Sequence, residues 1–307
     1  MSDPCPLCGS TQGSLHAVAE DIEYFTSAEQ FRFIHCGSCD VLFIAPMLHD
    51  RLREIYPERY YSFRPGNAGF VQRAKAVLDR RMFRDLLRNI PDPSLAVLDV
   101  GGGTGWLLDL VRTSDPRPMS TQVVDIDPDA KEAAEQAGHR YFLGPIENFE
   151  TEQSYQMILM LNFIEHVRRP DEILAKARRL LAPGGVLLIK TPNFAALDAR
   201  LFRHRSWGGY HTPRHFVLFN RNSFARLAAA QGLRVASFSY TQGAPFWTVS
   251  VLNELRRAGL ATVSRERPSI YHSLVPLLQV MFAGVDFIRR PFGALSQMFF
   301  VLARDDR

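Results

Sequence analysis

The chain has 307 residues, of which 46% are hydrophobic and 22% charged, an ordinary globular composition with ample apolar residues for a core. Its length predicts about two domains. The formal net charge of +4 permits an acidic partner but does not argue for one, because a nucleic-acid binder normally concentrates basic residues on one face. We identify no signal peptide, and the apolar stretches fall short of the ~20 residues that a membrane span needs. We therefore expect a cytoplasmic protein.

The four cysteines form two C-x2-C pairs near the start of the chain. Two thiolate pairs on tight turns suit tetrahedral zinc, which takes four protein ligands without redox change. A pair of disulfides is the alternative, which a cytoplasmic location disfavours. Because the protein would fill every ligand position, we expect structural rather than catalytic zinc. The predicted zinc ribbon covers residues 1–45, and its ligands are Cys5, Cys8, Cys36 and Cys39.

Residues 46–92 are predicted to link this ribbon to the rest of the chain. The segment begins aromatic and turn-rich, then continues as "FVQRAKAVLDRRMFRDLLRNI", where apolar residues recur every three or four positions. The spacing predicts an amphipathic helix with an inward stripe made of Val71, Ala74, Leu78, Met82, Leu86 and Ile90. Its many arginines indicate a solvated face, with a nucleic-acid or lipid surface as the alternative.

From residue 95 onward, short apolar runs alternate with amphipathic segments. The runs "LAVLDV", "TQVVDIDP", "RYFLG", "YQMILMLN", "VLLIKTPN", "LRVASFSY" and "QMFFVLAR" predict seven strands. With helices between them, residues 93–307 are predicted to form an α/β domain, a doubly wound and mostly parallel seven-stranded sheet of Rossmann-like type. Ligands of such sheets bind beyond the carboxyl ends of the strands.

A glycine-rich stretch, "VLDVGGGTGW", follows the first of these strands. Glycine is favoured where the backbone needs positive φ or must approach a ligand closely. Gly101, Gly103 and Gly105 give the spacing G-x-G-x-G, and Asp127 stands 22 residues after the last of them, at the end of the second strand. A carboxylate at that place can accept hydrogen bonds from both ribose hydroxyls. The loop is therefore predicted to hold a nucleoside.

Residues 241–290 interrupt the alternation before the last strand. The stretches "FWTVSVLNELRRAGL" and "LVPLLQVMFAGVDFIRR" are apolar with helical spacing and contain several arginines. We expect a helical insertion that caps the acceptor pocket. Whether it only packs on the sheet or also makes a peripheral contact with a membrane stays open.

Four blocks of sequence together carry a family resemblance. They are "VLDVGGGTGWLL", "VVDIDPDA", "LNFIEHVRRPDEILAKARRLLAPGGVLLIKTPN" and "HFVLFNRNSFARLAAAQGLRV". In this order, over residues 95–240, they resemble a class I S-adenosylmethionine-dependent methyltransferase. The branch is the one related to ubiquinone-biosynthesis O-methyltransferases and to sugar and natural-product methyltransferases. Some members of this branch carry a similar zinc-ribbon head.

The resemblance implies a cofactor, S-adenosyl-L-methionine, and a role for each matching position. Asp99 would brace the glycine loop, and Gly101 and Gly103 would line the methionine part of the cofactor. Asp127 would hold the ribose. Ile146 and Glu147, after the third strand, would meet the adenine, and the backbone near Leu161 would meet the methionine amino group.

One departure from the family concerns a metal. Some ubiquinone-pathway relatives have a carboxylate three residues before a Glu-His pair, where it can help to bind a divalent cation. This chain has Asn162 there, so only Glu165 and His166 of that set remain. A catalytic divalent metal is therefore not expected, and the sequence does not settle the point.

The catalytic base is sought among the histidines, because imidazole has a pKa near neutral pH. His204, His211 and His215 lie in "RHRSWGGYHTPRHF", a segment after the fifth strand that can reach the methyl end of the cofactor. His211 and His215 are the preferred candidates, with His166 competing. Trp207 and Tyr210 can form an apolar wall. Alternatively, these histidines only satisfy backbone groups of the loop.

Two classes of function remain. The first is O-methylation of a small molecule (a sugar, a glycan or a secondary metabolite) by in-line methyl transfer with a histidine base. The second is an RNA base methyltransferase with a zinc-ribbon RNA-binding head. The chain reads "LNFIEH" where amino-directed enzymes often have Asn/Asp-Pro-Pro-aromatic, and its modest charge also disfavours RNA. A non-catalytic binder is a third possibility, and the sequence does not reveal the oligomeric state.

Overall fold

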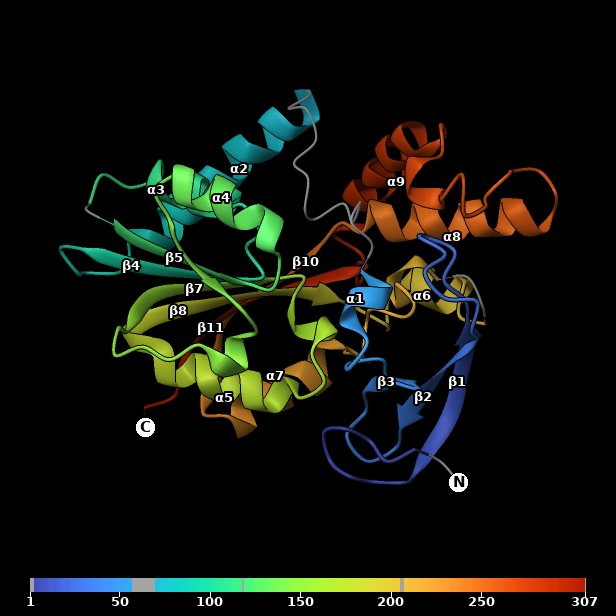
Figure 1. The fold of residues 1–307 in the computed structure, drawn as a ribbon, viewed down its shortest axis with the longest axis horizontal. Helices are drawn as coiled ribbons and strands as arrows, with labels where there is room; N and C mark the ends of the chain where they lie inside the picture. Colours follow the sequence, from blue (N-terminus) through green and yellow to red (C-terminus); the bar gives the residue numbers. More distant parts are fainter. Residues whose placement is uncertain (1–2, 57–69, 118, 205–206, 307) are drawn as a thin grey trace.

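The computed structural model describes residues 3–56, 70–117, 119–204 and 207–306. Its centre is a seven-stranded sheet in the order β10-β11-β8-β7-β4-β5-β6 (Figure 1). β11 runs antiparallel to both neighbours, and the five strands from β8 to β6 are parallel. The predicted doubly wound, mostly parallel sheet is confirmed. Its strands are β4 (Leu95–Val100), β5 (Met119–Asp125), β6 (Arg140–Leu143), β7 (Tyr155–Leu161), β8 (Leu181–Pro192), β10 (Leu233–Thr241) and β11 (Gln297–Arg304).

Helices cover both faces of this sheet, as the alternating pattern predicts (Figure 1). The inner strand β4 is buried along its whole length, and its side chains contribute to two separate apolar cores. One core holds α2 (Phe70–Leu87), α3 (Trp106–Arg112) and α4 (Pro128–Gln136) against the sheet. The other holds α5 (Pro170–Leu180) and α7 (Arg221–Ala230).

The N-terminal segment forms a separate small sheet in the order β1-β2-β3-β9. All its pairings are antiparallel, and its last strand comes from the loop that carries the predicted histidines. We call the part before α1 the head. Its elements are β1 (Gly13–Ala19), β2 (Phe31–Cys36) and β3 (Leu42–Ala45), followed by α1 (Leu52–Ile55), and β9 is Val217–Leu218.

The predicted helical insertion before the last strand is present as α8 (Ala244–Arg257) and α9 (Val275–Arg289). Both lie at one end of the large sheet, away from the helices of its two faces (Figure 1). Short helical turns complete the chain at α6 (Leu197–Leu201), η2 (Ile146–Asn148), η3 (Ile164–His166), η4 (Gly208–Tyr210) and η5 (Ser269–Tyr271). In the part of the chain that the structure describes, no helix has the length and apolar character to cross a bilayer.

The helix in the linker forms, and its predicted inward stripe is confirmed in part. Ile90 is buried, and Met82 and Leu86 are partly buried against the same core. Leu78 is exposed, and Phe83 and Leu87, which lie outside the predicted stripe, are buried. Val71 belongs to the part of α2 whose side chains lie outside the described residues, as does Ala74. The aromatic part of the linker, residues 57–69, also lies outside them.

Candidate functional site

The four cysteines of the head come together as the spacing predicts. The Sγ atoms of Cys5 and Cys39 are 3.5 Å apart, those of Cys8 and Cys36 are 3.6 Å apart, and all four lie within 4.8 Å of one another. These separations exceed a disulfide bond, and the four thiols are free. A tetrahedron with Zn–S bonds of ~2.3 Å has sulfurs about 3.8 Å apart, so the donor set fits zinc.

Both cysteine knuckles share one backbone geometry. In each, the amide of the fourth residue after the first cysteine donates to that cysteine's carbonyl: Gly9 to Cys5 at 2.9 Å and Asp40 to Cys36 at 3.0 Å. Both residues adopt positive φ, 70° and 59°. Glycine takes this conformation at no steric cost, and aspartate tolerates it because its short side chain can hydrogen-bond locally. His35 contacts the Asp40 carboxylate at 2.8 Å.

The glycine loop lies where β4 ends, at the carboxyl edge of the parallel strands. Gly101, Gly103 and Gly105 all have positive φ, and Gly105 precedes α3 as its N-cap residue. A Cβ atom at Gly101 would lie 2.8 Å from the ring of Phe163, so this position also needs glycine for close packing. The loop therefore presents backbone rather than side chains at the edge of the sheet where ligands of this architecture bind.

Asp99 lies beneath this loop and is buried. Burial raises its pKa to about 8, and the nearby charge of Asp125 adds to the shift. A Cβ atom at Gly102 would lie 2.6 Å from the Asp99 carboxyl group, so loop and carboxyl are in close contact. One oxygen, Oδ2, has no hydrogen-bond partner among the described residues. This arrangement fits the predicted bracing position of Asp99.

Two aspartates stand at the end of β5, beside the loop. Asp125 is partly exposed, and its carboxylate accepts from the amides of Gly103 at 2.8 Å and Asp127 at 3.0 Å. Asp127 is buried and caps α4 by accepting from the amide of Asp129 at 2.9 Å. Its other oxygen has no partner among the described residues. Burial raises the pKa of both carboxyl groups.

The remaining predicted cofactor residues lie along the same edge. Leu161 ends β7, and the next residue, Asn162, has positive φ and donates its amide to the carbonyl of Lys190 at 2.7 Å. Ile146 is buried in η2, while Glu147 is exposed and its carbonyl accepts from Lys176 at 2.8 Å.

The structure brings three predicted histidines together and leaves one out. The rings of His166 and His215 are 4.6 Å apart between centroids, and those of His211 and His215 are 4.9 Å apart. His211 and His215 are buried, whereas His204 is exposed. Burial lowers the pKa of His166 to about 3 and that of His215 well below its usual value. Two of the three imidazoles are therefore neutral near neutral pH.

Glu165 completes this histidine cluster. It is fully buried, its Oε1 lies 3.9 Å from Nε2 of His215, and neither carboxyl oxygen has a partner at hydrogen-bond distance among the described residues. Burial raises its pKa to about 8. The ligand atoms of Glu165, His166 and His215 lie within 4.8 Å of one another, a spacing at which they can hold a cation.

Several residues that hold the cluster in place were missed in the sequence. Glu23 of the head lies 2.9 Å from Nδ1 of His211, and the hydroxyl of Tyr56 lies 2.7 Å from Nδ1 of His166. These partners are about 190 and 110 residues apart in the chain, so no local pattern signals them.

The fully buried Arg214 ties the head to the histidine loop. Its guanidinium donates to the carboxylate of Asp21 at 2.9 Å and to the carbonyls of Ile55 and Thr212 at 2.7 and 2.9 Å. The ring of Tyr24 lies against the same guanidinium, with its centroid 4.5 Å from Cζ of Arg214. The only signal in the sequence was its place between the two candidate histidines in "HTPRH".

The predicted apolar wall lies against the head. Trp207 and Tyr210 are both buried, and the Tyr210 ring stacks on Phe33 of β2 with centroids 4.3 Å apart. The indole of Trp207 donates to Asp198 at 2.8 Å. The segment that carries the histidines is therefore fixed on one side by the head and on the other by the end of the large sheet.

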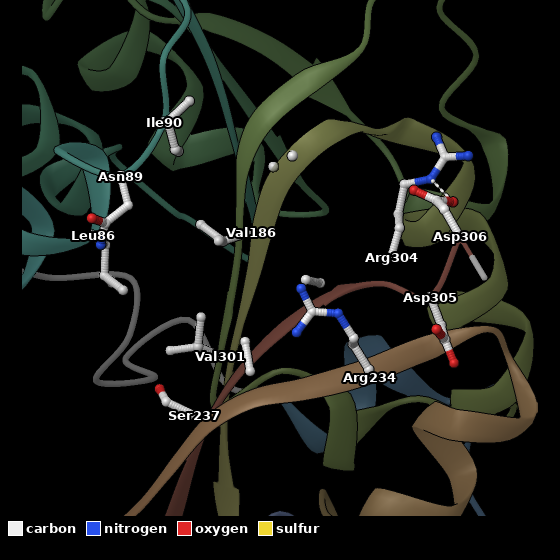
Figure 2. A pocket seen from close by; sticks show the side chains of 14 residues that line it. Leu86, Asn89, Ile90, Val186, Arg234, Ser237, Val301, Arg304, Asp305 and Asp306 are labelled. Atoms are coloured by element: carbon white, nitrogen blue, oxygen red, sulfur yellow. Dashed lines mark hydrogen bonds and ion pairs between the residues drawn. The ribbon is translucent and has the colours of Figure 1, made fainter.

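A hollow of about 650 Å³ lies elsewhere on the molecule (Figure 2). Its lining comes from the end of α2, the beginning of β8 and β10, and the end of β11, and includes Ile90, Val186, Arg234 and Val301. These segments meet at the opposite edge of the sheet from the glycine loop. The hollow therefore lies far from the loop and the histidine cluster, and we assign it no part in the site.

A parallel sheet with one antiparallel strand and a glycine loop after its first parallel strand is an α/β architecture whose ligands bind at the carboxyl edge of the strands. A family model described as a methyltransferase domain matches residues 72–237, more than half of the chain. The chain belongs to this methyltransferase family.

Curated relatives share part of this domain. A mitochondrial ubiquinone biosynthesis O-methyltransferase of Candida albicans is 32% identical over 125 residues, which cover 38% of this chain and 37% of that protein. A malonyl-[acyl-carrier protein] O-methyltransferase of Halalkalibacterium halodurans is 30% identical over 130 residues, covering 39% and 48%. The chain thus spans less than half the length of these relatives.

Solved structures share the fold. Coclaurine N-methyltransferase, crystallised with N-methylheliamine and SAH, aligns over 78% of this chain and 75% of its own, with 14% identity and a TM-score of 0.50. A sarcosine dimethylglycine methyltransferase homologue from Galdieria sulphuraria aligns over 76% and 88%, with 17% identity and a TM-score of 0.50.

Proposed function

We propose that this protein is an S-adenosylmethionine-dependent methyltransferase that methylates an oxygen of a small molecule, such as a sugar, a glycan or a secondary metabolite. One observation carries the proposal: the glycine loop and the histidine cluster are adjacent. Phe163 packs on Gly101 of the loop, and Glu165 and His166 follow it directly. A cofactor held at the loop would lie beside a buried group of proton acceptors. Membership of the methyltransferase family supports the same activity.

The cofactor would be held at the carboxyl edge of the sheet. Backbone at Gly101, Gly103 and Leu161 would meet its methionine part, and η2, with Ile146 and Glu147, would meet its adenine. The ribose hydroxyls would bind the acid pair at the end of β5. Bound there, S-adenosylmethionine supplies a methyl group made electrophilic by the sulfonium. The chain's own task is then to align an oxygen with the S–CH3 bond, which can supply ~7–11 kcal/mol of barrier lowering.

His211 is the better of the two preferred candidates for the base. Its Nδ1 faces the Glu23 carboxylate at 2.9 Å, an arrangement that orients the ring and strengthens the other nitrogen, Nε2, as a proton acceptor. It also adopts a φ of 40°, a strained value for a residue with a side chain, and such strain is common at active sites. His211 would accept the proton of the acceptor hydroxyl as the methyl group is transferred.

His215 and Glu165 would position the acceptor rather than take its proton. Nδ1 of His215 donates to the carbonyl of Gly209 at 2.8 Å, so its Nε2 faces Glu165. The lowered pKa of His215 makes it a weak base, and the raised pKa of Glu165, about 8, keeps that carboxyl protonated near neutral pH. A protonated carboxyl can donate a hydrogen bond to a substrate oxygen.

The test is turnover by the full chain with methyl-labelled S-adenosylmethionine and a panel of phenols, sugars and sugar nucleotides. His211→Ala should lower the methyl-transfer rate by about 10²–10⁴-fold, the usual contribution of a general base, with nearly unchanged cofactor affinity by calorimetry. His204→Ala is the matched control, because His204 is exposed on the same segment and should turn over normally. Normal turnover by both His211→Ala and His215→Ala would show that alignment alone carries the catalysis.

The pH profile separates the candidate bases. With His211 as base, a proton on Nε2 would remove the proton acceptor, so the rate should fall toward acid pH and the fall should be lost in His211→Ala. If ionised Glu165 were the base, the fall would begin near pH 8. His166 and His215 stay neutral throughout this range because their pKa values are lowered. If the rate falls from about pH 8 downward, and this fall is absent in Glu165→Gln, then Glu165 rather than His211 is the base.

We expect added Mg²⁺ to leave the methyl-transfer rate unchanged.

The RNA alternative is disfavoured by the charge of the head. Residues 1–45 contain one arginine and six carboxylates, whereas a phosphate-binding head needs several cations. The cysteine geometry supports structural zinc in this head instead. In that role the metal would fix the loop that brings Asp21 and Glu23 to the histidine cluster. RNA that binds and is released by salt would revive the alternative.

A further inference from the structure

The outward face of α9 is apolar although it is exposed to solvent. Residues three and four apart on a helix share one face, and here that face carries no charged side chain over about three turns, from Leu277 to Ile288. Phe292, just beyond the helix, is exposed in the same way. The exposed fractions are 66% for Leu277, 64% for Val280, 47% for Met281, 77% for Phe287, 69% for Ile288 and 86% for Phe292. We call these six residues the α9 face.

The opposite side of α9 is already packed. The ring of Phe282 stacks on Trp247 of α8 with centroids 5.2 Å apart and planes 13° apart. Asp286 is fully buried, accepts from the amide of Gly243 at 2.8 Å, and is paired with Arg289 at 3.1 Å. The helix cannot rotate its outer face inward without breaking these contacts. A helix that is apolar on all sides is normally buried on all sides, so the α9 face needs an external partner.

The charges of the segment that carries this face favour one kind of partner. Between residues 259 and 294, Arg265, Arg267 and Arg290 are exposed, against one exposed carboxylate, Glu266, which accepts from Ser264. The other acid, Asp286, is buried against Arg289. Exposed apolar side chains on a segment whose exposed charges are mostly arginines, with Arg290 directly after the helix, fit the boundary between acyl chains and anionic headgroups. A second copy of the chain would instead bring like positive charges together.

We propose that the α9 face docks on an anionic lipid bilayer. Protruding phenylalanines and leucine would enter the acyl boundary, while the arginines would meet lipid phosphates. The 15-residue helix is ~22 Å long, too short to span the bilayer, and it would rest on the surface. α8 joins this face to the site, because its Ser250 accepts from the amide of Gly208 in η4, three residues before His211. Docking would therefore hold the histidine loop one helix away from the lipid.

The experiment is co-sedimentation of the full chain with vesicles. We expect the protein to sediment with equimolar phosphatidylglycerol and phosphatidylcholine at low salt, and to stay in the supernatant with phosphatidylcholine alone. Leu277→Ser with Phe287→Ser should lower the partition coefficient at least about tenfold, since each exchanges a large apolar side chain for a polar one. Arg290→Glu should weaken binding less and reduce its salt dependence.

The control is Leu15→Ser, an equally exposed leucine on the head, which should bind vesicles as the unmodified chain does. Circular dichroism and the methyl-transfer rate in solution check that the variants remain folded. No binding of the unmodified chain to the anionic vesicles at low salt overturns the proposal. So does a dimer in light scattering that Phe287→Ser abolishes, because the α9 face would then belong to a second copy.

Discussion

The head and the α8–α9 insertion both pack against the loop that carries the histidines, but their polar groups serve opposite purposes. The head is acidic, with one arginine against six carboxylates in residues 1–45, and directs Asp21 and Glu23 inward to Arg214 and His211. The insertion has six arginines and three carboxylates in residues 244–292, and it turns apolar side chains outward.

The difference shows that two additions to a common fold can stabilise the same loop in different ways. Buried charges are tolerated only when they are paired, and the head supplies those pairs to the loop. The insertion packs on η4 through α8, with a hydrogen bond from the Gly208 amide to Ser250 and no ion pair to the loop among the described residues, so its second helix is free to keep an apolar surface for a partner. Damage to the head should therefore disturb folding and catalysis, whereas changes on the α9 face should leave both intact.

Of the changes we predict, loss of zinc should have the largest effect, on both the folding of the head and methyl transfer. We expect about one zinc per chain in purified protein, with binding energy on the scale of the ~10–16 kcal/mol seen for structural zinc sites. Cys36→Ala should lose the metal, unfold the head and abolish methyl transfer, because Glu23 would no longer hold His211. Metal analysis and circular dichroism measure this. Free thiols without metal in freshly purified, unchelated protein would contradict it.

Breaking the buried ion pair should come next. Arg214→Ala leaves the Asp21 carboxylate buried without its partner, and should lower the free energy of unfolding by about 3–5 kcal/mol in a urea titration. Arg226→Ala is the control: Arg226 is exposed and contacts the Cys39 carbonyl at 3.1 Å, so its loss should change stability by less than about 1 kcal/mol. Equal effects of the two variants would mean that the head is not anchored through Arg214.

The seven-stranded sheet could be predicted because its signals are local. Each strand is a short apolar run, and the glycine loop marks the ligand edge without knowledge of any distant residue. The predicted inward stripe of the linker helix was wrong at Leu78 and missed Phe83 and Leu87, for a related reason. Val77 and Leu78 are as apolar as Phe83 and Leu87, and only packing on α3 and the sheet decides which pair is buried.

The residues that hold the histidine cluster could not be predicted. Asp21 meets Arg214 across 193 positions, and charged residues in loops have no periodicity that separates a buried pair from a solvated one. For the exposed face of α9 the sequence left two alternatives open, because an apolar helix predicts burial and the sequence does not tell which side has a partner.

Substitution of the two aspartates at the end of β5 should have the smallest effect. It should weaken cofactor binding, which should depend on neither the head nor the insertion. The sequence assigns the ribose to Asp127, but Asp125 is the more accessible of the two acids and already contacts the glycine loop. We therefore expect Asp125→Asn to weaken S-adenosylmethionine binding by about 1.5–3 kcal/mol in calorimetry, the range for a hydrogen bond to a charged group. Asp127→Asn should cost less, since asparagine still caps α4. Arg226→Ala should leave affinity unchanged. A loss at Asp127 alone would uphold the assignment made from sequence, because the ribose would then bind the buried oxygen that lacks a partner.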